Sequence, residues 1–523
     1  MKRRRGRSCA AARAAAVSVP EAGYGMDASV LAITLELDAT RWELRLCFRL
    51  PDGGEGPAGP LPLPFTADDL ALCERALELN HSAHPRADFT APEIARLGGW
   101  GLLRQPSNPP GPAALSGQDL HRERLRAQVQ GWLVHLLLDP LAAPIQALFA
   151  VQRAKAERER PLLYLRLELW PTDLTLFRLP WELLHGYRLP QGDLLVGRYI
   201  RYEQAAGLPP PAPRLQVLVL HSEPKDLPPL VLQDRARIAA GLAGTAGAAR
   251  MPIQALDPAS LEGLQEALLA LGATPTILHF AGHGDFGWRC EQCRGISHGL
   301  DDTPCGRADC GFRRHGPPEG LLAFTDPATG EPDWVGIDGV SDTLKLAGDL
   351  RLVVLTACKS AAGRRGADVF NGLAQRLMDL VPAVIASPFP LETGAAESFA
   401  GSLYAALGAG LSLVEALHQV HLRMKPRFPD EWYRPVLYLR SSQGDGGRLL
   451  QMEDDTPVVG DPPADPPHPL LAMLQAQYEA AIEQSVTAVD AVTQVKAQQQ
   501  ADKVERDMQR LKHALKRNRG GAQ

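Results

Sequence analysis

Apolar and polar residues alternate along residues 30–37 and again along residues 42–48, with a polar stretch at 38–41 between them. A period of two is typical of strands that bury one face, so this segment is predicted to form a β-hairpin. Three further elements are expected in the same region: helices over residues 118–138 and 144–157 and a strand over residues 162–169. We therefore expect residues 26–206 to form an α+β region, in which no catalytic constellation is visible.

From residue 214 the pattern changes to short, continuous apolar runs that alternate with helical periods. Strands are expected over residues 215–220, 275–280, 321–324, 350–355 and 383–386. Helices are expected over residues 231–242, 260–271, 370–380, 395–407 and 413–424. Strands of this kind are buried on both faces, so the fold class predicted for residues 214–440 is α/β, a doubly wound and mostly parallel sheet with flanking helices.

The two ends of the chain differ from this pattern. Residues 1–25 begin Lys-Arg-Arg-Arg after the initial Met and contain no sustained apolar run, so we expect a disordered tail or a miscalled start codon. Residues 441–469 are rich in Gly, Asp and Pro and are predicted to be a linker. Residues 470–518 lack Pro and Gly and carry an apolar stripe, which predicts a long amphipathic helix or coiled coil. That helix would dock on its own chain, form a homo-oligomer or bind a partner protein.

Composition narrows the class of protein. The chain has 523 residues, of which 45% are hydrophobic and 22% charged, which is typical of folded domains. Its net charge of -5 gives no excess of positive charge for nucleic acid as the main partner. No apolar stretch reaches the roughly 18 residues that a membrane span needs. With eight cysteines in so long a chain, a disulfide scaffold is not expected, and we predict a reducing, cytoplasmic location.

Two predicted strands of the second region end in reactive residues. His283 follows the strand at 275–280, and Cys358 follows the strand at 350–355. Because the carboxyl ends of parallel strands meet at one edge of a sheet, these two residues could lie together, with imidazole as the base for a thiolate. The alternative is a structural cysteine buried after an apolar strand, beside a histidine in a turn.

Four cysteines are clustered in residues 287–316: Cys290, Cys293, Cys305 and Cys310. Two close pairs of thiolates at this spacing are typical of a structural, tetrahedral zinc site, with His298 and His315 as alternative or spare ligands. The other reading is a surface loop with reduced cysteines. Because the cluster closely follows His283 in sequence, we also expect it to shape the rim of the site.

Several motifs resemble the CHAT-domain family, the bacterial caspase-like cysteine peptidases related to separases. The most specific are His-Phe-Ala-Gly-His-Gly at residues 279–284 and Leu-Thr-Ala-Cys-Lys-Ser at residues 355–360. Leu-Pro-Trp-Glu-Leu-Leu at residues 179–184 and Trp-Tyr-Arg-Pro-Val-Leu-Tyr-Leu at residues 432–439 also resemble family elements. The resemblance covers residues 162–440.

The resemblance implies a caspase-like fold with His283 as general base and Cys358 as nucleophile. Backbone N–H groups of Gly284 and Cys358 would form the oxyanion hole, and catalysis would need no cofactor. The substrate would be a protein or peptide, and an activating partner or self-association through residues 470–518 would control cleavage. The family implies a role in bacterial conflict or cell-death signalling. Where relatives often carry an Asp after the strand at 383–386, this sequence has Glu392.

Two other functions fit the same residues. The first is a catalytically idle scaffold, or protein-interaction module, that keeps the peptidase fold. The second is nucleic-acid binding through arginines of the cysteine-rich segment, which the acidic balance of the whole chain disfavours. The arginines in question are Arg289, Arg294, Arg307, Arg313 and Arg314.

Overall fold

The computed structural model describes most of the chain between residues 28 and 452. Within that span it leaves out residues 80–85, 105–111, 155–160, 171–172, 202–207, 231–232, 291, 294–295, 298–304, 306–309, 313–318, 360–376, 388–390 and 441–445. The predicted tail at 1–25, most of the linker at 441–469 and the helix at 470–518 therefore lie outside the described residues, as does most of the helix expected at 370–380.

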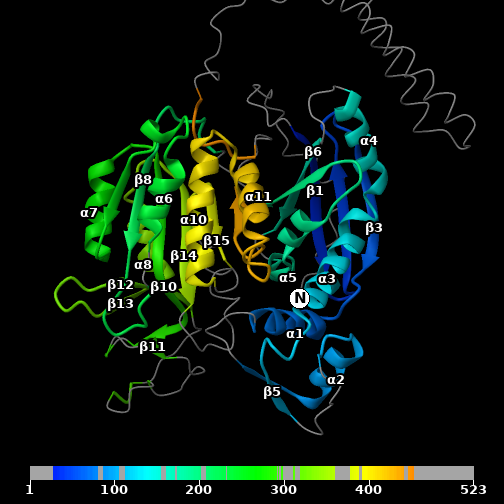
Figure 1. Ribbon diagram of the computed structural model, residues 1–523, viewed down its shortest axis with the longest axis horizontal. Coiled ribbons are helices and arrows are strands. Elements are labelled where there is room, and N and C mark those ends of the chain that lie inside the picture. The colour runs from blue at the N-terminus through cyan, green and yellow to red at the C-terminus, as the bar shows by residue number, and fades with distance from the viewer. Residues whose placement is uncertain are drawn as a thin grey trace, which may run out of the picture. The chain divides into compact units, whose positions relative to one another are not determined.

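A parallel block of five strands forms one half of the sheet (Figure 1). In spatial order these strands are β9 (Ile253–Leu256), β8 (Gln216–His221), β10 (Thr276–Arg289), β14 (Leu350–Lys359) and β15 (Ala383–Ala386). All neighbours in this block run parallel. The doubly wound, mostly parallel sheet predicted for residues 214–440 is thus confirmed.

A second parallel block continues the same sheet. Its strands are β16 (Val436–Leu439), β7 (Asp193–Ile200), β6 (Leu162–Leu169) and β1 (Ala28–Asp38), followed by the antiparallel β2 (Glu43–Arg49) and β3 (Glu55–Pro62). Because β16 pairs antiparallel with β15, the second block runs opposite to the first. The carboxyl ends of the two blocks therefore lie at opposite edges of the sheet.

Strand β10 is longer than its sequence predicts and changes its neighbour halfway. Residues 276–281 pair with β8, whereas residues 284–287 pair with β12 (Glu319–Thr325), which pairs in turn with β13 (Pro332–Gly336). The end of β10 also pairs with β11 (Ile296–Ser297). The change of neighbour falls at Gly282 and His283, so the edge of the sheet opens at the predicted base.

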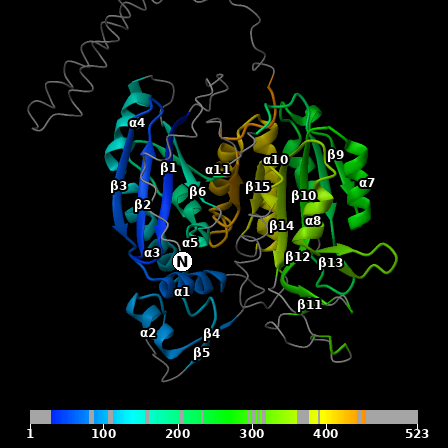
Figure 2. The ribbon, with the colours of Figure 1, turned by 180° about the vertical axis from the view of Figure 1, so that it is seen from behind.

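Helices cover both faces of the first block. The helices α6 (Asp234–Leu242) and α10 (Thr393–Gly408) pack side by side on one face, and α11 (Leu413–Met424) lies beside α10, against β7 and β16 of the second block. On the other face lie α7 (Leu261–Leu271) and α8 (Ile337–Leu344), as the view from behind shows (Figure 2). Only a short 3-10 turn at Ala248–Arg250 lies between α6 and β9.

The remaining helices and a small hairpin come from the N-terminal region. These are α1 (Ala67–Glu78), α2 (Ala91–Gly99), α3 (Arg122–Leu133), a π-helical turn (Val134–Leu138), α4 (Ala142–Ala154), α5 (Leu174–Arg178), a 3-10 turn (Trp181–Gly186) and the small hairpin β4 (Ala87–Phe89) and β5 (Ala113–Leu115). Helix α1 begins after Thr66, whose hydroxyl accepts a hydrogen bond from the N–H of Asp69 in a capping box. Among the described residues, no single helix is long and apolar enough to span a membrane. Helix α3 with its π-turn and helix α4 would together be long and apolar enough, but an 80° bend separates them.

Candidate functional site

The backbone register brings the two predicted catalytic residues together. Strands β10 and β14 are parallel neighbours, and in their ladder His283 lies opposite Cys358. Neighbouring strands are about 4.8 Å apart, so residues 75 positions apart in sequence become direct neighbours in space. Of Cys358 the structure describes the backbone alone.

The imidazole of His283 is held by a single hydrogen bond. Its side chain is buried, and its Nε2 lies 2.9 Å from the backbone oxygen of Pro228, to which it donates. Its Nδ1 is buried and has no hydrogen-bond partner among the described residues. A bond of this kind fixes the tautomer with the proton on Nε2, which leaves the lone pair of Nδ1 available.

Burial also keeps His283 in the neutral form that a base requires. Desolvation lowers the pKa of His283, and the carbonyl of Pro228 and the charge of Glu223 only partly offset this effect. At neutral pH the ring is therefore uncharged and able to take up a proton. General bases of this type work best when their pKa does not exceed the working pH by much.

The chain after β8 makes this arrangement possible by passing over β10. The carboxylate of Glu223 accepts a bond of 2.8 Å from the N–H of Leu230, which closes a loop around Pro228. Beneath it, a Cβ added to Gly282 would lie 2.9 Å from the backbone oxygen of Ser222. Glycine at 282 therefore allows the backbone of Ser222, which precedes this loop, to lie close to β10.

His279, four residues before His283 on the same strand, belongs to the core. Its Nε2 lies 3.0 Å from the hydroxyl of Thr356 and 3.3 Å from a carboxylate oxygen of Asp234. Its Nδ1 lies 3.3 Å from the hydroxyl of Tyr404, and burial and the charge of Asp234 raise the pKa of that phenol. These contacts give β10 and β14 a shared polar support.

The predicted oxyanion residue Gly284 is also buried, between the two neighbours of β10. It lies opposite Lys359 of β14 on one side and Leu322 of β12 on the other. Its position one residue after His283 puts its backbone beside that of Cys358, so the two N–H groups named from the sequence belong to adjacent strands.

A buried acid that the sequence did not reveal lies at the start of α10. The backbone N–H of Glu392 donates a 2.7 Å bond to Oε2 of Glu431, and burial raises the pKa of Glu431. Leu391 and Ala396 pack against Leu230, which follows Pro228 in the covering loop. Glu431 comes from the segment after α11, so no spacing could place it there. Its position just before Trp432, where a family-like motif begins, was the one available signal.

The four clustered cysteines converge as predicted. Their sulfur atoms all lie within 4.8 Å of one another, with 3.5 Å between Cys290 and Cys310 and 3.4 Å between Cys293 and Cys305. Zn–S bonds of about 2.3 Å in a tetrahedron put sulfur atoms about 3.8 Å apart, so the donor set fits a four-coordinate metal. Burial opposes ionisation of Cys290, but hydrogen bonds from the N–H groups of Cys293 and Gln292 outweigh it and lower the pKa of this thiol to about 7.

The cluster lies at the far end of β10 from the site. Six residues lie between His283 and Cys290, and a fully extended strand of that length spans about 23 Å. Most of the cysteine-rich segment lies outside the described residues, so its expected role in shaping the rim of the site stays a prediction. The alternative metal ligands His298 and His315 lie outside the described residues, as do four of the five arginines named for nucleic-acid binding. The fifth, Arg289, forms a 2.7 Å ion pair with Asp333.

Comparisons with known proteins agree with the motifs. The family model of the CHAT domain matches residues 128–438 and so begins within the N-terminal region, before residue 214. Solved structures that are similar include a secreted C11 cysteine protease from Bacteroides thetaiotaomicron, at 12% identity and a TM-score of 0.25. The alignment covers 39% of this chain and 56% of the protease, so this chain spans only about half the length of that protein.

A second pair of similar structures comes from the separase–securin complex of Saccharomyces cerevisiae. The two structures have 12% and 11% identity and TM-scores of 0.31 and 0.35, and each alignment covers 79% of this chain and 30% of that one. No curated protein matches the sequence.

Proposed function

Because the chain belongs to the CHAT-domain family, we propose that it is a caspase-like cysteine endopeptidase with His283 as general base and Cys358 as nucleophile. The observation that carries the proposal is the register of β10 and β14, which pairs these two residues at an open edge of the sheet. The buried Nδ1 of His283, which has no partner among the described residues, supports it, because a base needs a free lone pair.

The reaction follows from these groups. Nδ1 of His283 takes the proton of the Cys358 thiol, and the thiolate attacks the carbonyl carbon of the scissile peptide. The N–H groups of Gly284 and Cys358 stabilise the negative oxygen of the tetrahedral intermediate. His283 then gives its proton to the leaving amine, and water hydrolyses the thioester. Throughout, Pro228 holds the ring through Nε2.

We assign a structural role to a zinc ion bound by Cys290, Cys293, Cys305 and Cys310. Four thiolates leave no open position for a substrate, so the metal would fold the cysteine-rich segment rather than take part in cleavage. Replacement of Cys290 and Cys293 by Ser should abolish one equivalent of bound zinc, measured by elemental analysis. Full zinc content in this variant would contradict the assignment.

We base a proposal for regulation and cellular role on the family and on the terminal segment. Residues 470–518 would bind an activating protein or a second copy of the chain, in the cytoplasm, so that cleavage is confined to bacterial conflict or cell-death signalling. A protein or peptide would be the substrate. Truncation after residue 452 that leaves cleavage and its dependence on added partners unchanged would exclude this role for the segment.

Thiol reactivity tests the dyad without knowledge of the substrate. We expect iodoacetamide to alkylate Cys358 at least tenfold faster than Cys73, since burial raises the pKa of Cys73 and makes it an internal control. His283→Ala should slow alkylation of Cys358 and leave Cys73 unchanged, with both sites quantified by mass spectrometry.

Cleavage of a peptide library by wild type, Cys358→Ala and His283→Ala then tests turnover. Cleavage by wild type alone would assign the dyad. If Cys358 reacts no faster than Cys73 and no peptide is cut, with candidate activators added in turn, the chain is an idle scaffold.

A further inference from the structure

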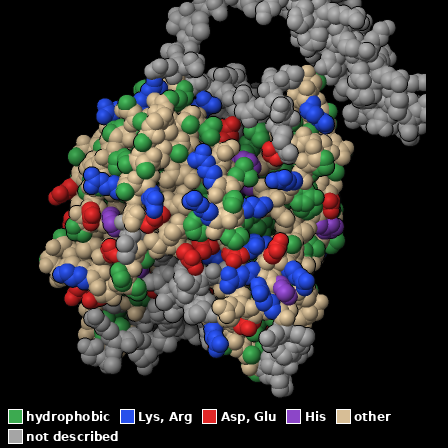
Figure 3. All heavy atoms as spheres, viewed as in Figure 1, with side chains coloured by type: hydrophobic (Ala, Val, Ile, Leu, Met, Phe, Trp, Pro, Cys, Tyr) green, Lys and Arg blue, Asp and Glu red, His purple; other side chains and the backbone are tan. Residues whose placement is uncertain are grey.

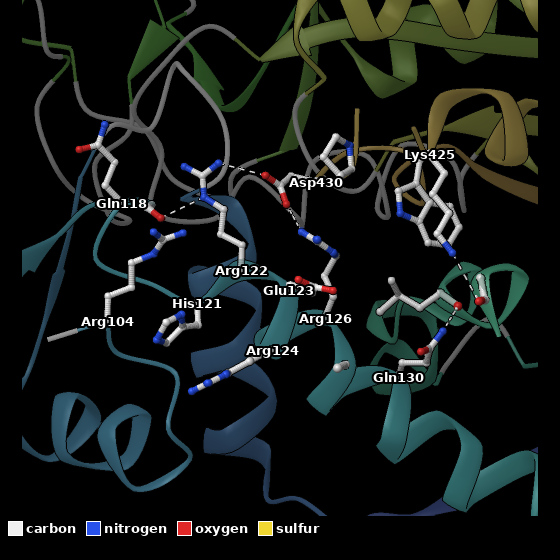
Figure 4. Close-up of a pocket in the computed structure, with 16 residues that line it drawn as sticks. Arg104, Gln118, His121, Arg122, Glu123, Arg124, Arg126, Gln130, Lys425 and Asp430 are labelled. Carbon is white, nitrogen blue, oxygen red and sulfur yellow. Dashed lines mark hydrogen bonds and ion pairs between the residues drawn. The ribbon is translucent and has the colours of Figure 1, made fainter. Parts of the chain in front are cut away.

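A basic cavity of about 1120 Å³ opens between α3 and the segment that follows α11 (Figure 4). Five basic and two acidic side chains line it, which leaves three positive charges in excess. These side chains are Arg104, Arg122, Arg124, Arg126, Lys425, Glu123 and Asp430. In the space-filling view, Lys and Arg side chains gather around the position of α3 (Figure 3). Nothing in the peptidase mechanism uses this cavity.

Among the described residues, two of the basic groups, Arg122 and Arg126, form ion pairs, and both do so with the same carboxylate. The carboxylate of Asp430 lies between Arg122 and Arg126 and forms an ion pair with each, at 3.0 Å from Arg122. Two like charges sharing one carboxylate are still under-compensated. A pair of this kind needs a further anion nearby, or solvent, to balance it.

The other three basic groups have no acidic partner within the part of the chain that the structure describes. Arg104 donates to the backbone oxygen of Leu120, Arg124 to that of Gly101, and Lys425 to that of Gly186 at 3.4 Å. Burial and the positive charges of Arg188 and Arg126 lower the pKa of Lys425, which shows that its surroundings disfavour a further cation.

The first turn of α3 adds backbone donors to the same cavity. His121 precedes the helix, lines the cavity and makes no side-chain capping bond, so the initial N–H groups have no such acceptor. Those groups and the helix dipole favour an anion at this end, next to Arg122 and Arg124.

We propose that this cavity binds a small molecule with two or more phosphate groups. Its volume of about 1120 Å³ is slightly above the range of about 300–1,000 Å³ that is usual for small-molecule pockets. Arginine side chains present donors in the planar fork that fits phosphate oxygens, and two of them, Arg104 and Arg124, have no acidic partner among the described residues. The ligand would replace the missing anion and join the N-terminal helices to the segment around Asp430.

Calorimetric titration of the full chain carrying Cys358→Ala tests the site, because binding is then measured without any cleavage. Inorganic triphosphate, in magnesium-free buffer, should saturate one site, and its affinity should fall as salt rises from 50 to 200 mM. Arg104→Gln combined with Arg124→Gln should weaken binding at least tenfold. Arg427→Gln is the matched control, since Arg427 is an exposed arginine of the same segment that does not line the cavity, and it should change affinity less than twofold.

ATP distinguishes the source of the phosphates. Tighter binding of ATP than of triphosphate assigns the site to a nucleotide, and equal binding assigns it to the phosphate chain alone; both support the proposal. Lys425→Gln, weakening triphosphate binding threefold or more, replaces the double variant if that variant does not fold. Absence of saturation by either compound overturns the proposal, as does an equal loss in Arg427→Gln. Tighter binding of an oligoglutamate peptide or an oligonucleotide through the same arginines also overturns it.

Discussion

The two parallel blocks of the sheet have similar architecture but treat their buried polar groups differently. In the first block, Nδ1 of His283 on β10 is buried and has no partner among the described residues. In the second block, Arg198 on β7 donates to Glu182 at 2.5 and 2.9 Å and to the backbone oxygens of Phe177 and Leu179. Glu168 on β6 lies 2.8 Å from Arg166, whose Nε has no partner among the described residues. Burial opposes ionisation of Glu168, yet Arg166 and Arg201 lower its pKa.

This difference distinguishes buried polar groups that stabilise the fold from buried polar groups that can react. A buried charge pair with its hydrogen bonds complete has nothing left to offer a ligand, and it is costly to break. A buried group with one free atom costs stability, and such a cost is common where a reaction needs that atom. The second block therefore supports the sheet, whereas the edge of the first block is suited to react.

Breaking the paired block should have the largest effect on stability. Glu182→Gln leaves the fully buried guanidinium of Arg198 without its counter-charge, which should lower the free energy of unfolding by about 3–5 kcal/mol. The measurement is chemical denaturation of the wild type and the variant under identical conditions.

His283→Ala is the matched variant in the other block. It should change the free energy of unfolding by only about 1 kcal/mol, because the loss of the hydrogen bond to Pro228 is partly offset by the removal of the unsatisfied Nδ1. At a temperature where both variants are folded, Glu182→Gln should leave the alkylation rate of Cys358 unchanged. A slower rate in Glu182→Gln would remove the distinction between the blocks.

The sequence predicted the first block better than the second, for physical reasons. Strand β14 and its neighbours are continuous apolar runs because both of their faces are buried, so their pattern is unmistakable. Strand β7 was not predicted, because Asp193, Gly197 and Arg198 interrupt its apolar run. Arg198 is tolerated there only because Glu182 arrives from a distant turn, and no local pattern encodes that contact.

The candidate site was predictable to the same extent. His283 and Cys358 follow recognisable strands, so the topology of a parallel sheet was enough to bring them together. The bond from His283 to Pro228 and the placement of Glu431 depend on irregular segments, whose course hydrophobic periodicity does not determine. The length of β10 was underestimated because His283 and Gly284 look like the start of a loop.

Acid should lower the stability of the protein through three buried histidines. His185, His418 and His421 pack together, with 2.6 Å between the Nδ1 atoms of His185 and His421. Burial lowers the pKa of His418 to about 4, opposed by Asp193, and burial lowers the pKa of His421 to about 3, opposed by the carbonyl of Pro435. Burial and the two neighbouring histidines lower the pKa of His185 as well.

These lowered values fix the sign of the pH dependence. Unfolded histidines bind protons below about pH 6.5, whereas the folded ones stay neutral, so the stability present above pH 6.5 is lost as the pH falls. The loss between pH 6.5 and 5.5 is about 1 kcal/mol per histidine, or about 3 kcal/mol in all. Denaturation at both pH values measures it. His418→Phe, which keeps a ring that does not titrate, should reduce the loss by about a third, and an unchanged loss would show that other groups are responsible.

The prediction with the smallest expected effect tests what determines the role of a buried polar group. Either its hydrogen-bond partners decide that role, or its position in one block of the sheet does. Tyr404 lies on α10, which packs against β14 of the first block, and its hydroxyl is paired, 3.3 Å from Nδ1 of His279. If pairing marks a supporting group, Tyr404→Phe should lower the free energy of unfolding by about 1 kcal/mol and change the alkylation rate of Cys358 less than twofold. Thr356→Val, which removes the 3.0 Å contact on the other nitrogen of His279, should behave alike. A large loss of Cys358 reactivity with little loss of stability would mean that the hydrogen bonds around His279 position the reacting groups. Stabilising and reacting polar groups would then differ by the block in which they lie, and not by whether they are hydrogen-bonded.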